Sequence, residues 1–222
     1  MARKTPTAKS PAATALTTRS NERAVNAFTD IRDWTLNNPD GISRDFSYDI
    51  LKRQFRGVEH STVKYVRAKL RHPTGSLDHA VLHRDVAANQ VLLPRGAADM
   101  MACPHRLWSE MDNAFMGTDQ HLLAGPTIWF PEPVVQHWAI RQVVAFAQAK
   151  IADFYGAAVH VIAHAPERIA HGSDFHIHLL CTARIVKGSG FGEFVRPLVK
   201  TGCQLALKAE WEAWWSKSTA NT

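Results

Sequence analysis

The amino-acid sequence predicts an α+β fold, with one antiparallel β-sheet and helices packed on one face. Segments with the two-residue alternation of strands interleave with segments of helical periodicity in an α+β order. The chain has 222 residues, 45% of them apolar, which is enough for a single domain with a sizeable core. We therefore expect one folded domain, over residues 21–222, preceded by a tail.

The first 20 residues are expected to form a disordered basic tail. They contain Arg3, Lys4, Lys9 and Arg19 and no acidic residue, in a background of Thr, Ala, Ser and Pro. Such a composition buries too little apolar surface to offset the entropy lost on ordering.

The first half of the domain alternates helices and strands. Apolar residues on one side, followed by an Asn-Asn-Pro-Asp-Gly turn, predict a helix over residues 21–38. Residues 46–53 alternate as a first strand, which ends before an Arg56-Gly57 turn. Residues 61–71 predict a helix that stops before Pro73, and residues 81–93 hold one or two strands.

The second half predicts further helices and strands. Helices are expected over residues 104–115, 133–155 and 205–215, the long middle one with Pro133 in its first turn, where a missing N–H costs nothing. Strands are expected over residues 127–130, 159–164 and 175–182.

The cysteine content and hydropathy exclude several classes of protein. Cys103, Cys181 and Cys203 are widely spaced, which indicates neither a disulfide framework nor a thiolate zinc site. No apolar run approaches the ~20 residues of a membrane span, and the N-terminus lacks the apolar stretch of a signal peptide. We therefore expect a cytoplasmic protein without membrane insertion.

The segment Asp174-Phe175-His176-Ile177-His178 is the most informative part of the sequence. On a strand, His176 and His178 project from the same face and can address one divalent cation. His164 ends the preceding apolar strand and can supply a third nitrogen if the two strands pair; His160 and His171 are alternatives. Three neutral imidazoles would leave open positions for water or a phosphate oxygen, as in catalytic metal sites.

Positive charge is concentrated near the N-terminal third of the domain. Residues 41–72 hold eight basic residues against three acidic ones, a clustering that favours contact with a polyanion. The basic residues that we expect to bind phosphates are Lys52, Arg53, Arg56, Lys64, Arg67 and Arg71. A solvated charged helix is the alternative interpretation.

The order of these motifs resembles that of the MobA/MobL plasmid-mobilisation relaxases, which are single-strand DNA nickases of the HUH class. The resemblance is carried by residues 161–166, 174–180, 182–184 and the Gly190-Phe191-Gly192 sequence. Weaker similarities lie at residues 91–97, 107–108, 127–131 and 207–211. The resemblance as a whole covers about residues 46–215.

The resemblance implies a five-stranded antiparallel sheet and a metal held by His164, His176 and His178. It also implies a tyrosine that attacks the scissile phosphate and forms a 5′-phosphotyrosine. Mg²⁺ or Mn²⁺ is the expected metal, with Zn²⁺, Ni²⁺ or Co²⁺ as alternatives. The expected partners are single-stranded DNA and accessory relaxosome proteins.

Tyr65 is the expected nucleophile among the three tyrosines. On its helix, Val63, Val66 and Leu70 are predicted to be buried, with Tyr65 pointing away from the core beside a basic ridge. The chain departs from the family at two positions: the family nucleophile would fall near Ala68, one helical turn later, and a frequent family acid is replaced by Gly125.

Three functional hypotheses follow from the sequence. The leading one is a metal-dependent relaxase, an enzyme that cleaves single-stranded DNA at a plasmid or mobile-element origin and acts in conjugation. The second is a non-catalytic derivative that binds single-stranded DNA through the same fold. The third is a structural or regulatory metal protein that does not bind DNA.

Overall fold

The computed structural model describes residues 34–71, 77, 82–114 and 120–220. The expected tail over residues 1–20 and most of the expected helix over residues 21–38 lie outside these residues. So does the boundary that we placed at residue 21, which stays a prediction.

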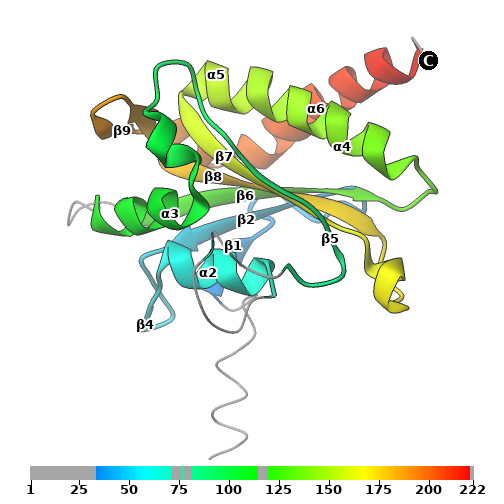
Figure 1. Ribbon diagram of the computed structural model, residues 1–222, viewed down its shortest axis with the longest axis horizontal. Coiled ribbons are helices and arrows are strands. Elements are labelled where there is room, and N and C mark those ends of the chain that lie inside the picture. The colour runs from blue at the N-terminus through cyan, green and yellow to red at the C-terminus, as the bar shows by residue number, and fades with distance from the viewer. Residues whose placement is uncertain (1–33, 72–76, 78–81, 115–119, 221–222) are drawn as a thin grey trace, which may run out of the picture. The chain divides into compact units, whose positions relative to one another are not determined.

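Within the described residues, the fold is α+β, as predicted, and its main sheet has seven strands. The sheet order is β1-β2-β6-β8-β7-β5, with β9 paired to β8, and every pairing is antiparallel (Figure 1). The strands are β1 (Thr35–Asn37), β2 (Phe46–Lys52), β5 (Val86–Leu92), β6 (His121–Phe130), β7 (Ala157–His164), β8 (Phe175–Lys187) and β9 (Gly190–Phe194). A separate two-stranded hairpin consists of β3 (Gln54–Phe55) and β4 (Val58–Glu59).

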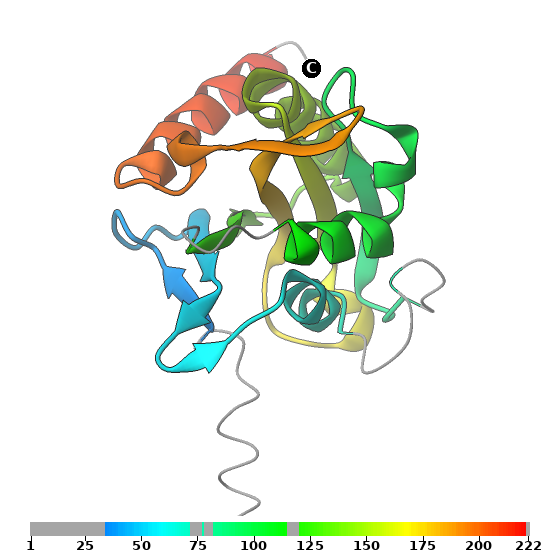
Figure 2. The same ribbon diagram turned by 90° about the vertical axis from the view of Figure 1, so that its left-hand side faces the viewer.

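The helices lie on both faces of the main sheet (Figures 1 and 2). One face carries α4 (Gln136–Ala147), the π-helical turn η3 (Gln148–Ala152), α5 (Asp153–Tyr155) and α6 (Cys203–Ala220). The other carries α2 (Thr62–Lys69) and α3 (Pro104–Asn113). Short 3-10 turns complete the order: η2 (Asp99–Ala102), η4 (Pro166–Ile169) and η5 (Arg196–Leu198).

Two details of the predicted sheet are therefore wrong. The sheet has seven strands rather than five, and helices cover both of its faces rather than one. The second difference has a simple cause: the face under α2 and α3 also presents large apolar side chains, including Leu123, Ile162 and Leu180, all of them buried. Such residues need cover, and the apolar stripes of α2 and α3 provide it.

The expected helix over residues 21–38 is also wrong where the structure describes it. Residues 35–37 form β1, with Thr35 opposite Leu51 and Asn37 opposite Asp49. Pairing with the edge of β2 outweighs the weak helical periodicity, because helix propensity is easily overridden by tertiary contacts. The long helix begins at Gln136 rather than Pro133, and it then continues through η3 to Tyr155.

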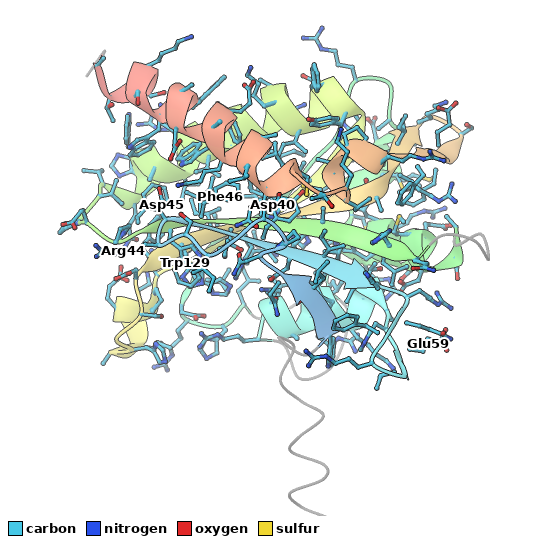
Figure 3. All side chains as sticks on the ribbon, turned by 180° about the vertical axis from the view of Figure 1, so that it is seen from behind. Asp40, Arg44, Asp45, Phe46, Glu59 and Trp129 are labelled. Atoms are coloured by element: carbon cyan, nitrogen blue, oxygen red, sulfur yellow. The ribbon has the colours of Figure 1, made fainter. Side chains whose placement is uncertain are left out.

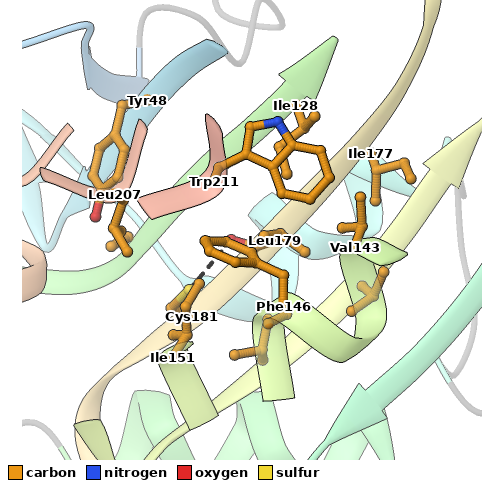
Figure 4. Close-up of a cluster of buried hydrophobic side chains, with 14 of the residues drawn as sticks. Tyr48, Ile128, Val143, Phe146, Ile151, Ile177, Leu179, Cys181, Leu207 and Trp211 are labelled. Carbon is orange, nitrogen blue, oxygen red and sulfur yellow. Dashed lines mark hydrogen bonds between the residues drawn. The ribbon is translucent and has the colours of Figure 1, made fainter. Parts of the chain in front are cut away.

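The main hydrophobic core lies between the sheet and the helices α4 and α6 (Figure 4). Phe146 of α4 meets Trp211 of α6 with their ring centroids 5.3 Å apart, in an edge-to-face arrangement. Ile177, Leu179 and Cys181 of β8 project into this core, as the strand alternation predicts. The intervening residues of β8 therefore face α2 and α3.

Helix α2 is fixed to α3 at its N-terminus. Ser61 caps the helix, and Asp112 of α3 accepts hydrogen bonds from the Thr62 backbone at 2.7 Å and from the Ser61 hydroxyl at 2.6 Å. The carboxylate thereby satisfies donors that a helix start leaves without intrahelical partners. A residue fifty positions away in the chain thus joins the start of α2 to α3.

Candidate active site

Three histidines from β7 and β8 converge on the sheet face that carries α2. His164 is the cross-strand partner of His176, and one nitrogen from each of His164, His176 and His178 lies within 4.8 Å of the others. All three side chains are buried. The alternation of β8 and its antiparallel pairing with β7 create this cluster, as the sequence predicts.

The outer nitrogen of each imidazole has its own hydrogen-bond partner. His176 Nδ1 lies 2.8 Å from the Asp174 carbonyl oxygen, and His164 Nδ1 lies 3.3 Å from Asp85 Oδ2. Both partners can only accept, so Nδ1 carries the proton and Nε2 keeps a lone pair. His178 Nδ1 lies 2.8 Å from the Thr127 hydroxyl, which can accept in the same way.

Burial keeps these imidazoles neutral. It lowers the pKa of His176 to about 4 and lowers the pKa of His178 well below its usual value. Burial also lowers the pKa of His164, although the Asp85 carboxylate opposes this effect. Neutral imidazoles with oriented Nε2 lone pairs fit a divalent transition metal, because no proton has to be displaced from the ligand atoms.

Asp85 connects the histidine cluster to the basic residues around it. Its fully buried carboxylate contacts His83 Nδ1 at 2.6 Å, Arg71 Nε at 3.2 Å and His164. Burial alone would raise the pKa of Asp85, but the His83 hydrogen bond and the positive charge of Arg71 lower it overall. Sequence reasoning missed Asp85, because it precedes β5, far from the histidine motif, and no local pattern marks it.

Trp129 is a second residue that the sequence did not single out for the site. It lies opposite His176 in the β6–β8 pairing, and the two rings stack with their centroids 4.3 Å apart. Its indole nitrogen donates to Ser47 at 3.0 Å, which fixes the ring plane. Figure 3 shows Trp129 beside Asp45, whose carbonyl oxygen accepts from the Trp129 backbone. Trp129 thus holds one face of His176.

The alternative third ligands lie outside the cluster. His160 accepts a hydrogen bond from the Trp108 indole at 3.0 Å and contacts Asn89 through its other nitrogen. His171 is exposed and bonds to Ser173 within its own loop. His164 is therefore the histidine that the fold brings to His176 and His178.

Tyr65 is buried, contrary to the expectation that it points away from the core. Its side chain is only 1% exposed, and its hydroxyl donates to Asp49 Oδ2 at 2.9 Å. The reason is that α2 is covered on two sides, by the sheet and by α3, so its buried face is wider than the stripe of Val66 and Leu70. Burial, together with the adjacent Asp49, raises the pKa of the Tyr65 hydroxyl well above its usual value.

Lys69 links Tyr65 to the histidine cluster. Its ammonium group lies 3.2 Å from Asp49 Oδ2 and 5.3 Å from the centre of the Tyr65 ring. Its charge contributes to lowering the pKa of His176 and His178, and its backbone contributes to raising that of His164. The C-terminal end of α2 therefore lies against the metal-ligand candidates.

Of the three tyrosines, Tyr65 alone faces this site. Tyr48 belongs to the core under α4 and α6 and donates to the Leu198 carbonyl oxygen at 2.7 Å. Tyr155 packs against the same core.

The β2–β6 pairing places Asp49 opposite Gly125, with the Asp49 Cβ 3.6 Å from where a side chain at position 125 would begin. The carboxylate absent from Gly125 is thus present on the neighbouring strand.

The predicted DNA-binding residues lie at the end of β2, at the β3–β4 hairpin, on α2 or just after it. Arg53 pairs with Glu59 at 2.7 Å, and Arg71 pairs with Asp85. Lys52 and Arg56 flank the ring of Phe55. Lys64 is exposed on α2, and Arg67 is half-buried. These positions do not test whether the basic residues bind DNA, so that role stays a prediction.

Comparison with known proteins agrees with this fold. The model of the MobA/MobL family matches residues 72–221, and the chain therefore belongs to this family, the relaxase family that its sequence resembles. A solved structure titled "Molecular Basis of Vancomycin Resistance Transfer in Staphylococcus aureus" matches with a TM-score of 0.50 and 20% identity, over 60% of this chain and 69% of that chain. At this identity the similarity concerns the fold. No curated protein matches the chain.

No helix in the described part of the chain is both long and apolar enough to cross a membrane.

Proposed function

We propose that the protein is a metal-dependent relaxase that cleaves single-stranded DNA at the origin of a plasmid or other mobile element. Family membership supports the class, and the convergence of His164, His176 and His178 supports the metal dependence. The cation would be held by the three Nε2 atoms. When bound, it supplies positive charge that stabilises the negative charge developing on the scissile phosphate.

The identity of the metal follows from the donor set only in part. Mg²⁺ and Mn²⁺ are the expected metals, whereas imidazole ligands in general suit transition metals better than Mg²⁺. We therefore propose Mn²⁺ as the first metal to test, with Mg²⁺, Zn²⁺, Ni²⁺ and Co²⁺ compared beside it.

We further propose Tyr65 as the nucleophile, because it is the tyrosine on the face that carries the histidines. In this step its oxygen bonds to phosphorus, and the bond from phosphorus to the 3′ oxygen breaks. Asp49, which already accepts the hydrogen bond of the phenol, takes its proton. The departing 3′ oxygen takes a proton from solvent. Because Tyr65 is buried, α2 has to move outward before a phosphodiester can reach it.

A second candidate function is favoured by the same burial. In a non-catalytic derivative, Tyr65 would serve only as a packing residue tied to Asp49, and the fold would bind single-stranded DNA without cutting it. Such a protein would show binding that weakens steeply with salt and that does not depend on the Tyr65 hydroxyl.

The experiment that separates these functions is a covalent-adduct assay. The protein is incubated with Mn²⁺ and single-stranded oligonucleotides from its own genomic neighbourhood, and a DNA adduct is sought on a denaturing protein gel. We expect an adduct that Tyr65→Phe abolishes and that Tyr155→Phe, the matched control on the opposite face, leaves unchanged. Asp49→Asn should slow adduct formation about 10²–10⁴-fold, the usual range for a lost general base.

Each other outcome contradicts a stated part of the proposal. An adduct that survives Tyr65→Phe assigns the attack to a different residue. If no adduct forms, and a supercoiled plasmid bearing the origin also stays uncut although DNA binds, the non-catalytic derivative is the correct function. Loss of the fold on chelation without any DNA affinity would instead support a structural metal protein.

The expected single-strand DNA partner, the accessory relaxosome proteins and the cytoplasmic location belong to this proposal.

A further inference from the structure

The β3–β4 hairpin carries an aromatic residue whose placement the metal site does not explain. Arg56 and Gly57 both adopt positive φ angles, of 51° and 78°. Two consecutive left-handed residues make the tight turn that matches the twist of paired strands. The turn therefore holds Phe55, the last residue of β3, at a defined place next to the hairpin tip.

Two cations flank the Phe55 ring. Arg56 Cζ lies 5.2 Å from the ring centre, and Lys52 Nζ lies 5.9 Å from it. The ring itself is half-buried, and Arg56 is exposed. Glu59, the acidic residue of this hairpin, is paired with Arg53 at 2.7 Å. The surface around Phe55 is thus aromatic and positively charged.

The hairpin lies at the opposite end of α2 from the histidine cluster. Two residues separate β4 from α2, and Arg71, just beyond the last residue of α2, pairs with Asp85, which also contacts His164. Figure 3 shows Glu59 and Trp129, which mark the two ends, on opposite sides of the domain. The eight residues of α2 span roughly 12 Å at the usual rise.

Basic residues continue between the two ends. Lys64 is exposed in the first turns of α2, Arg67 follows one turn later, and Arg71 lies just beyond the helix beside Asp85. Together with Lys52 and Arg56 they place basic residues at the hairpin, along α2 and beside the histidine cluster. Clustered positive charge of this kind attracts the phosphates of a single strand.

We propose that Phe55 is a stacking platform for an unpaired base of single-stranded DNA, a few nucleotides away from the scissile phosphate. Lys52 and Arg56 bind the phosphates on either side of that base. An aromatic ring flanked by cations is the combination with which proteins hold single strands, since every base has a face to stack and every nucleotide a phosphate. The distance from the cleavage point rests on the proposed function; the stacking site does not.

The test is a binding titration of fluorescein-labelled single-stranded dT30 and a mixed-sequence 30-mer, followed by anisotropy. Phe55→Ala should raise the Kd about fivefold or more, because loss of base stacking typically has an effect of this size. Phe55→Leu, which keeps an apolar side chain and protects the hairpin fold, should also weaken binding. Phe55→Trp should restore it. Phe154→Ala is the matched control, because Phe154 is a 73% exposed phenylalanine on α5.

Salt dependence separates stacking from charge. Phe55→Ala should leave the slope of log Kd against log salt unchanged, whereas Arg56→Ala should make it shallower. Irradiation of the same strands with 5-iododeoxyuridine in place of thymidine should give a crosslink at Phe55, identified by mass spectrometry.

The outcomes are distinct for the two proposals. If the wild-type protein binds the strands and Phe55→Ala and Phe55→Leu bind equally well, the stacking site is wrong even when the adduct assay succeeds. If duplex DNA binds as tightly and responds equally to Phe55→Ala, the hairpin contacts duplex and the proposal is also wrong. A stacking effect in a protein that forms no adduct would support this site and contradict the relaxase chemistry.

Discussion

The two faces of the central sheet differ in the kinds of side chain that they bury. The face under α4 and α6 is filled by aliphatic and aromatic groups, such as Val161, Ile177 and Phe146, each at most 1% exposed. The face under α2 buries His164, His176, His178 and Thr127 among its apolar residues. Alternate residues of the same strands therefore have different roles. Those on the α4 and α6 face form the hydrophobic core, and those on the α2 face include the residues of the candidate site.

Two tyrosines illustrate the same contrast. Tyr48 and Tyr65 are both almost fully buried, yet Tyr48 donates to a main-chain carbonyl, whereas Tyr65 donates to a carboxylate shared with a lysine. A carbonyl oxygen accepts the hydrogen bond of a buried hydroxyl, but it is too weak a base to take the proton. A carboxylate can accept the proton. Burial alone thus does not distinguish a packing residue from a candidate nucleophile, and the partner has to be considered.

The largest effect is expected from removing a histidine of the cluster. His176→Ala should weaken metal binding by more than the 10–100-fold typical of a lost hydrogen-bond partner of a ligand, because one of three ligands disappears. Calorimetric titration with Mn²⁺ and Zn²⁺ measures this, with His171→Ala as the control from the same loop region. Equal affinities for the two variants would mean that the cluster is not the metal site.

On the other face, Phe146→Ala should reduce the free energy of unfolding by about 3–5 kcal/mol. The substitution leaves a cavity against Trp211 and Trp214, whose rings lie 5.3 and 6.0 Å from that of Phe146. Urea denaturation measures the loss, and exposed Phe154→Ala should change stability by no more than about 0.5 kcal/mol. Metal affinity of the folded Phe146 variant should match the wild type; a parallel loss would show that the two faces are not separable.

Thr127→Val should lower metal affinity about 10–100-fold, because His178 loses the hydroxyl that orients its ring. Thr182→Val is the matched control: Thr182 is another buried threonine, and its hydroxyl bonds only to the backbone, at Ala158 and Arg184. Its substitution should reduce stability without changing affinity for the metal. The comparison fails if both variants bind metal alike.

The last prediction concerns His160, a buried histidine of the α2 and α3 face that lies outside the cluster. Burial lowers its pKa to about 3, so the unfolded chain binds a proton below its ordinary pKa of about 6.5 and the folded protein does not. The contribution of His160 to the free energy of unfolding is therefore fully present above pH 6.5. It is lost as the pH drops toward 3, by about 1.4 kcal/mol per pH unit.

Denaturation curves between pH 7 and pH 4 check this prediction. His160→Gln should lose stability at every pH, because Trp108 and Asn89 lose their partner, but its stability should fall less steeply with acid than that of the wild type. An unchanged slope would mean that His160 is protonated in the folded protein.

Much of the site followed from the sequence because its geometry is local. A two-residue repeat on a strand fixes His176 and His178 on one face, and the preceding strand, which ends in His164 and pairs with it, brings the third nitrogen alongside. The strand over residues 46–53 and the helix over residues 61–71 were likewise predicted within one or two residues, since the hydrophobic periodicity and the stop signals lie in the segments themselves.

What only the tertiary structure decided depends on residues far apart in the chain. The pairing of residues 35–37 with β2, the cover of both sheet faces and the burial of Tyr65 result from contacts that no local pattern encodes. Asp85 reaches His164, and Asp49 reaches Tyr65, only because strands and helices that are distant in sequence pack together. The sequence by itself determined the family, the α+β class and the three histidines. The packing of α2 against the sheet and α3 determined what surrounds them, because burial and hydrogen-bond partners are properties of the folded chain.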